Sequence, residues 1–313
     1  MAALPRIGYI LGDHAGIGPE IVSKALGHGA RAHQPVLIGN RRLYARATGL
    51  PEGAIEFPFE DIPAGPDIHT GSITAGSGRL ILESLERAMT MARSGQVDML
   101  ILAPITKQAL RAAGSPYFSE FDAFAAWFGV ESVGSVVQCG SVFRSTVVGH
   151  VPFANILERL TTDAIVRTGA GLWQMMERFP SPNLCLAVAA LNPHAGEDGL
   201  FGDEEARIIA PAVNRLCAMG MDATGPFPAD TVLLKARRKE VGGIVYLYHD
   251  QGNIATKSAF FEEGVVLYTN LPTPIASVGH GSALDIAGQN LASEANLLAC
   301  TRSLLSYWDA KGP

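Results

Sequence analysis

The sequence predicts an α/β protein of two lobes, built largely on parallel strands. Short apolar runs bounded by Gly or Pro alternate with longer segments of helical periodicity, and this alternation is typical of parallel α/β units. The chain has 313 residues, which is longer than one usual domain, and 48% of them are hydrophobic, so a large core can be buried. We therefore expect two packed lobes.

Each half of the chain repeats the alternation of strands and helices. In the first half we predict strand 7–11, helix 19–26, strand 36–38, helix 41–48, helix 74–94 and strand 99–103. In the second half we predict helix 155–179, strand 184–191, helix 203–219, strand 244–248 and helix 293–307. Because no Pro- or Ser-rich linker is present, we expect residues 1–104 and 260–313 to form lobe 1 and residues 105–259 to form lobe 2.

The composition argues against several classes of protein. A net charge of −6 and one short basic cluster, residues 235–239, give no cationic surface, so no nucleic-acid partner is expected. The four cysteines form no Cys-x-x-Cys pair, which fits a reducing compartment better than a zinc ribbon or a disulfide framework. The N-terminus lacks a signal-peptide pattern, and no run approaches the roughly 18 apolar residues of a spanning helix. We therefore expect a cytoplasmic protein with no membrane partner.

Polar clusters follow the strand-like runs, which is where open α/β sheets bind ligands. Three of the eight histidines, His150, His194 and His249, each end such a run. Neutral imidazole is a common ligand for a catalytic transition metal, and three ligands leave room for substrate. Each histidine could instead be a single side chain satisfied by a backbone carbonyl, because no His-x-x-x-His pair fixes their geometry.

The first glycine-rich segment, residues 12–20, does not match a dinucleotide fingerprint. Ile21 stands where the third glycine would be, so a Rossmann domain is not predicted. The chain also has no Gly-Lys-Ser/Thr sequence, which excludes a Walker phosphate loop. What remains is a strand, a tight turn and Pro19 at a helix start. Its backbone N–H groups could hold an anion or a polar cofactor group, although an ordinary strand-to-helix turn has the same pattern.

In their order along nearly the whole chain, the polar clusters resemble the 4-hydroxythreonine-4-phosphate dehydrogenase family. The matching segments are GDxAGIGPE at 12–20, APITK at 103–107, LNPHAGE at 191–197, GPxPADT at 225–231, YHDQG at 248–252 and HGSALDIAG at 280–288. The resemblance implies a two-lobed α/β/α fold like that of isocitrate and isopropylmalate dehydrogenases, not a Rossmann domain. It also implies a homodimer whose active sites take metal ligands from both subunits, with lobe 2 carrying these ligands and the dimer contacts.

The resemblance further implies oxidation of a secondary alcohol by NAD or NADP, followed by decarboxylation of the resulting β-keto acid. Its divalent metal, which could be Zn²⁺, Mn²⁺, Co²⁺ or Mg²⁺, would be held by His150, His194 and His249. Such a cation would stabilise the negative charge that develops in both steps. The implied cofactor-binding residues are Gly12, Asp13, Gly16, Gly18, His280, Gly281, Ser282 and Asp285.

Four further residues occupy the family's catalytic positions: Asp230, Asp250, Lys107 and Lys257. Either aspartate could orient a ligand histidine or accept the alcohol proton, and Lys257 could neutralise an acidic substrate. Each lysine could instead be an ordinary surface cation. A non-catalytic ligand-binding relative and a structural metal site remain alternatives, but a binding module has no reason to keep three potential ligands together with Asp230 and Lys257.

The chain departs from the family where phosphate is bound. The family's Gly-His-Thr-Glu stretch, whose His and Thr hold the substrate phosphate, is replaced by residues 117–122, which carry three aromatic rings and two carboxylates. Its phosphate-binding Asn and Arg fall on Val266 and Ile275, so Lys257 alone remains of that set. Burying a phosphate dianion without its donors costs several kcal/mol. The segment 277–283, with Gly279 where the phosphate enzymes carry Asp, resembles instead the terephthalate dihydrodiol dehydrogenases.

We therefore expect a small carboxylate substrate without phosphate, such as an aromatic-derived dihydrodiol. 4-Phosphohydroxy-threonine, the substrate of the phosphate enzymes in pyridoxal phosphate biosynthesis, is the alternative. The stretch 104–128 differs from the terephthalate subgroup as well, so the resemblance to that subgroup is incomplete.

Overall fold

The computed structural model describes residues 4–28, 32–180 and 183–311. The chain divides into two compact units, unit 1 with Met1–Gly134 and Val265–Pro313, and unit 2 with Ser135–Gly264. The crossovers thus follow residues 134 and 264, whereas the sequence placed them after 104 and 259. The first crossover comes later because helices α4 (Lys107–Ala112) and α5 (Glu120–Phe128) pack on α3 (Ala75–Arg93), a helix of unit 1.

The strands of unit 1 lie in the order β3-β2-β1-β4-β11-β10. Their bounds are β1 Arg6–Ile10, β2 Gln34–Gly39, β3 Phe59–Asp61, β4 Met99–Leu102, β10 Gly264–Thr269 and β11 Ile275–Val278. All neighbours are parallel except β10 and β11. The chain runs from β1 outward to β3 and returns to β4 on the other side of β1. The carboxyl ends of β1 and β4 therefore flank a switch point in strand order, where such sheets bind ligands.

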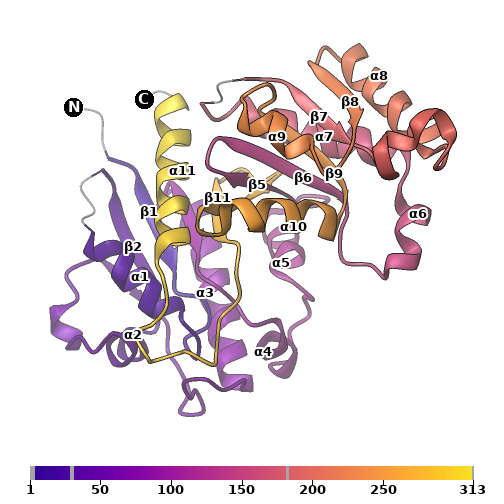
Figure 1. Ribbon diagram of the computed structural model, residues 1–313. Helices are drawn as coiled ribbons and strands as arrows, with labels where there is room; N and C mark the ends of the chain where they lie inside the picture. Colours follow the sequence, from indigo (N-terminus) through magenta and orange to yellow (C-terminus); the bar gives the residue numbers. More distant parts are fainter. Residues whose placement is uncertain (1–3, 29–31, 181–182, 312–313) are drawn as a thin grey trace. The chain divides into compact units, whose positions relative to one another are not determined.

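Helices cover both faces of the sheet in unit 1 (Figure 1). Besides α3, α4 and α5 they are α1 Gly18–Gly27, α2 Arg41–Thr48 and α11 Ala295–Lys311, with a 3₁₀ turn, η1, at Glu52–Ala54. Ile10 belongs to the same buried cluster as Leu85 of α3, whereas the neighbouring Tyr9 shares a hydrogen bond of 3.0 Å with Thr301 of α11. Successive strand residues point to opposite faces, so α3 and α11 cover opposite faces.

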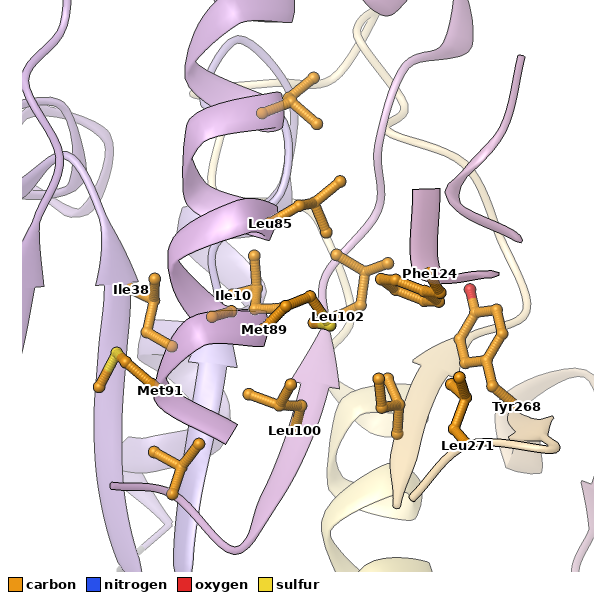
Figure 2. Packing of buried hydrophobic residues seen from close by; sticks show 14 of the residues in the cluster. Ile10, Ile38, Leu85, Met89, Met91, Leu100, Leu102, Phe124, Tyr268 and Leu271 are labelled. Atoms are coloured by element: carbon orange, nitrogen blue, oxygen red, sulfur yellow. The ribbon is translucent and has the colours of Figure 1, made fainter. Parts of the chain in front are cut away.

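Figure 2 shows the core on the α3 side of this sheet. Side chains of β1, β2, β4 and α3 meet Phe124 of α5 and Tyr268 of β10, and the two rings pack edge to face with centroids 5.0 Å apart. Ile275 of β11 belongs to the same buried cluster, and Val266 of β10 packs against it. The core of unit 1 thus joins segments from both ends of the chain.

The strands of unit 2 lie in the order β5-β6-β9-β7-β8. Their bounds are β5 Gly134–Cys139, β6 Val142–Val148, β7 Leu186–Ala189, β8 Ala223–Phe227 and β9 Gly243–Tyr248. β5 is antiparallel to β6, and the other neighbours are parallel. Four strands of unit 2, β6, β9, β7 and β8, therefore end at one common edge.

Helices also cover both faces of the sheet in unit 2. Their bounds are α6 Ile156–Arg159, α7 Thr162–Met176, α8 Ala210–Ala218, α9 Val232–Arg237 and α10 His249–Phe260. Shorter turns are the 3₁₀ helices η2 Phe153–Asn155, η3 Pro193–Gly199 and η5 Phe261–Glu263 and the π-helix η4 Glu205–Ile209. Tyr246 packs in one cluster with Val232 of α9, whereas a Cβ on Gly243 would collide with Met176 of α7. Helices α9 and α7 thus lie on opposite faces.

The predicted α/β fold is confirmed, and several element bounds differ from those expected. The helix expected at 155–179 is divided, because Leu160 and Thr161 are extended and the Thr161 side chain caps α7 by accepting the N–H of Ala164. The helix expected at 203–219 begins with the π-helix η4. Among the described helices, none is long and apolar enough to cross a membrane.

Candidate active site

The three predicted metal ligands follow the carboxyl ends of neighbouring parallel strands in unit 2. Val148 at the end of β6 pairs with Tyr248 at the end of β9. His150 lies two residues after Val148, and His249 directly follows Tyr248. β7 lies on the other side of β9 and leads into the turn that carries His194. The register of the sheet thus brings residues about a hundred positions apart to one edge.

His150 and His249 lie side by side at this edge. Their ring centroids are 4.7 Å apart, with the ring planes inclined by 46°. Nδ1 of His249 lies 2.6 Å from Oδ1 of Asp250. When Nδ1 carries the proton, it donates to this carboxylate and leaves the Nε2 lone pair available for a metal ion. The pair therefore has the arrangement of a ligand histidine with its orienting carboxylate.

His194 is held in a different environment from the other two histidines. It begins a turn with left-handed backbone, φ 53°, and its ring lies 6.4 Å from that of Phe201. In the described ranges of the chain, no three His, Cys, Asp or Glu side chains are grouped closely enough to hold a metal ion. One chain thus brings two of the three predicted ligands together.

The predicted catalytic residues are distributed over both units. Asp230 is exposed after β8, and Lys257 is exposed in the last turn of α10. Asp250 contacts His249 as described above. Lys107 belongs to unit 1, where its ammonium nitrogen lies 3.6 Å from Oε2 of the largely buried Glu120. The Glu120 carboxylate therefore offsets part of the positive charge of Lys107.

All the predicted cofactor-binding residues belong to unit 1 and follow β1 or β11. Residues 12–20 after β1 are buried throughout, whereas Gly281 and Asp285 after β11 are exposed. A Cβ on Gly16 would lie 2.5 Å from the Ser282 carbonyl oxygen, and one on Gly12, with φ 67°, would collide with the Pro104 carbonyl. Close packing of three loops therefore explains these glycines, and the accessible surface at the switch point is the turn at 280–285.

Sequence reasoning missed several contacts that hold these loops together. The Ile17 N–H, near the start of α1, donates to the Ser282 carbonyl at 3.0 Å, and the Thr106 hydroxyl donates to Ser282 Oγ at 2.9 Å. His14 accepts the Asn40 N–H at 3.0 Å, and burial lowers its pKa to about 4. Burial also raises the pKa of Asp13, whose Oδ2 has no hydrogen-bond partner among the described residues. No motif spacing indicates these contacts, because their partners are distant in the sequence.

Comparison with known proteins identifies the family. The family of the pyridoxal phosphate biosynthetic protein PdxA matches residues 31–303 of this chain. The chain belongs to the PdxA family. A D-threonate 4-phosphate dehydrogenase of Bordetella bronchiseptica is 33% identical over an alignment of 319 positions, gaps included. The alignment covers 94% of this chain and 90% of that protein. The family resemblance predicted from the polar clusters is therefore confirmed.

Solved structures agree with membership of the PdxA family. A 4-hydroxythreonine-4-phosphate dehydrogenase from Klebsiella pneumoniae matches with a TM-score of 0.84 and 29% identity, over 97% of this chain and 99% of that one. A terephthalate 1,2-cis-dihydrodiol dehydrogenase from Burkholderia xenovorans matches with a TM-score of 0.67 and 29% identity, over 97% and 98%. A β-decarboxylating dehydrogenase from Thermococcus kodakarensis, 17% identical with a TM-score of 0.51, shows the same fold. The predicted likeness to decarboxylating dehydrogenases is thus confirmed at the level of the fold.

Proposed function

We propose that this PdxA-family protein is a metal-dependent dehydrogenase that oxidises a secondary alcohol of a hydroxy-carboxylate with NAD or NADP and then decarboxylates the product. The observation that carries the proposal is the pair His150 and His249 at the common strand edge, with the Asp250 carboxylate hydrogen-bonded to Nδ1 of His249. The named relatives of the chain are dehydrogenases.

The donor set at this edge fits a divalent transition metal. Imidazole nitrogens are neutral ligands for Zn²⁺, Mn²⁺ or Co²⁺, and the Asp250 carboxylate fixes one of them in the tautomer that binds a cation. When bound, the cation would polarise the alcohol oxygen and stabilise the negative charge of both steps. Residues of the turn that begins with His280 would hold NAD or NADP, which would supply the hydride acceptor. We propose Zn²⁺ as the first ion to test.

The remaining residues would act on protons and on the charge of the substrate. Asp230 is exposed beyond β8, at the same edge as the histidines, and is suited to accept the proton of the alcohol. Asp250 is occupied by its contact with His249 and is better suited to orient that ring. Lys257 is an exposed cation on α10, the helix that begins with His249, and would attract a carboxylate substrate.

The site also supports a partner subunit in the assembly. One chain brings His150 and His249 together without the third predicted ligand. We propose that the enzyme is a homodimer in which His194 of one chain completes the pair supplied by the other.

Two core positions favour a substrate without phosphate. Ile275, where the phosphate enzymes would carry Arg, is 1% exposed in the core of unit 1, and the partly buried Val266, where they would carry Asn, packs against the same cluster. A polar anchor at either position would have to displace apolar packing. The hydroxyl of Ser119 is engaged as the N-cap of α5 with Asp122. A terephthalate-type dihydrodiol is the compound that these features and the terephthalate relative favour.

The names of the relatives favour a second candidate substrate. Relatives more than 30% identical are named for 4-hydroxythreonine-4-phosphate and D-threonate 4-phosphate. Lys257, an exposed cation of unit 2, could then attract the phosphate, and the pyridoxal phosphate pathway would be the setting for the first of these compounds.

The test is NAD(P) reduction by metal-loaded protein with the carboxylated dihydrodiol and with each of the two phosphates. Removal of metal with a chelator should abolish turnover, and Zn²⁺ should restore it. His194→Ala should lose both metal and activity, whereas the matched control His28→Ala, at an exposed contact with Glu294 in unit 1, should lose neither. Full turnover by metal-free protein would contradict the proposal. Turnover of the phosphates alone would change the substrate and leave the metal assignment in place.

A further inference from the structure

The turn that carries His194 has a left-handed backbone over five consecutive residues. His194, Ala195, Glu197 and Asp198 have φ values of 53°, 58°, 41° and 52°, and Gly196 has 83°. This conformation is unfavourable for residues that carry a Cβ atom. A run of four such residues persists only where neighbouring groups fix it. The groups around the turn therefore determine where the His194 imidazole lies.

The carboxylate of Glu205 fixes the start of this turn. Glu205 is 6% exposed. Oε1 accepts the backbone N–H of Leu191 at 2.9 Å and that of Asn192 at 2.7 Å, and Oε2 accepts the Asn192 side-chain amide at 2.9 Å. A Cβ on Gly196 would lie 2.9 Å from Oε2, so the turn packs directly on this carboxylate. Both oxygens of Glu205 thus hold the two residues that precede Pro193 and His194.

The element that carries Glu205 is itself unusual. Glu205 opens the π-helix η4, which runs into α8 and packs against α7 and β8. Short π-helical segments are rare and often occur at functional sites. Burial of Glu205 would raise the pKa of its carboxyl, but the hydrogen bonds from Asn192 and Leu191 outweigh this effect and the pKa lies below its usual value. The anion is therefore the form that holds the turn.

We propose that Glu205 is a positioning residue, which acts through Asn192 and the left-handed turn to hold the His194 imidazole where it can bind the divalent cation. The inference rests on the proposed function, since it assumes that His194 is a metal ligand. The partners of Glu205 are backbone and side-chain atoms of residues 191 and 192.

Glu205→Gln is the sharpest variant, because it keeps the size of the side chain and one acceptor oxygen. That oxygen can still accept the two backbone N–H groups, but the new NH₂ group would face the Asn192 amide, and two donors would then meet. Turning the Asn192 amide around would place its oxygen against Glu204 Oε2, which now accepts the same amide at 2.7 Å. Glu204→Gln is the matched control, because Glu204 binds Asn192 through one oxygen and a rotated amide can keep that bond.

Three measurements on the full chain in its native assembly test the proposal. Zn²⁺ affinity, measured by competition with a chromophoric chelator, should fall about 10- to 100-fold in Glu205→Gln and remain within about threefold in Glu204→Gln. The visible spectrum of the Co²⁺-loaded protein should change in Glu205→Gln and not in the control. Amide hydrogen exchange over residues 191–199 should become faster in Glu205→Gln, and faster still in Glu205→Ala.

The outcomes separate this proposal from the proposed function. If His194→Ala loses Zn²⁺ affinity while folded Glu205→Gln and Glu205→Ala keep it, the positioning role of Glu205 is wrong and the metal site stands. If wild-type protein binds no Zn²⁺, or His194→Ala binds it as tightly as wild type, the metal assignment fails and the positioning role fails with it. Unchanged amide exchange in both Glu205 variants would show that the carboxylate does not hold the turn.

Discussion

The Gln251 side-chain amide donates to the backbone carbonyl of Ala190 at 2.8 Å. Gln251 lies in the first turn of α10, two residues after His249, and Ala190 directly follows β7. The same side chain accepts the N–H of Leu247 through its oxygen at 2.8 Å. One amide thus fastens the helix that begins with His249 to the strand that leads to His194.

The first prediction is that Gln251→Leu destabilises unit 2 at this edge. Ala190 and Leu247 are fully buried, so the variant leaves an acceptor and a donor without partners. Such groups cost about 1–3 kcal/mol each. Urea unfolding should show this loss, and Zn²⁺ affinity should fall with it. Gln251→Glu, which keeps the acceptor but places an anion against a carbonyl, should be destabilised as well. A Gln251→Leu protein as stable as wild type would contradict the role of this amide.

The second prediction concerns the pH dependence of stability, which His14 should influence. Burial lowers the pKa of His14 from 6.5 to about 4 in the folded chain. Between these values the unfolded chain binds a proton that the folded chain excludes. Above about pH 6.5, His14 therefore does not lower the free energy of unfolding. As the pH falls toward 4, His14 lowers this free energy by roughly 3 kcal/mol. Urea unfolding measured from pH 7 to pH 4 should show the decrease.

The control for this prediction is His14→Gln, whose amide does not titrate. Its free energy of unfolding should depend less on pH in the same interval, even if the variant is less stable at pH 7. Identical pH profiles for the variant and the wild type would rule out His14 as the source of the slope.

The third prediction concerns the positions at which the phosphate enzymes would carry their anchors. Ile275→Arg should unfold or severely destabilise unit 1, because the guanidinium would enter the core cluster that contains Leu271 and Tyr268. The conservative Ile275→Val should cost about 1 kcal/mol. Thermal and urea unfolding compare the two. A stable Ile275→Arg protein that gains turnover of 4-phosphohydroxy-threonine would show that the position faces the substrate and not the core.

The fourth prediction follows from the contact between His150 and His249 in one chain. If one subunit supplies both rings to a site and its partner supplies His194, a mixture of His150→Ala and His249→Ala proteins should stay inactive after subunit exchange. A mixture of His150→Ala and His194→Ala should regain about a quarter of wild-type activity, since half of the dimers are mixed and each has one intact site. Recovery in the first mixture would place His150 and His249 in different sites.

The sequence was sufficient for the fold class and for the placement of the polar clusters at strand ends. His150, His194 and His249 each follow an apolar run, and parallel strands necessarily bring such positions to one edge. The left-handed turn at His194 and its anchor Glu205 were not predicted, although Glu204 and Glu205 follow the polar cluster 191–197 closely. Their contacts depend on a π-helix that no local propensity indicates. The crossover after Gly134 was missed because the packing of α5 on α3 is a long-range contact.

The division of the chain also sets an order for its assembly during synthesis. Unit 2 is one continuous segment, Ser135–Gly264, so all of its strands are synthesised before β11. Unit 1 cannot be completed at that time, because β11 pairs with β4 through Ile275 and Leu100 and supplies the turn against which Gly16 packs. Until then the edge of β4 lacks its neighbour and is open to wrong pairing. The last 49 residues, Val265–Pro313, are therefore the part of the chain whose arrival closes the nascent N-terminal sheet.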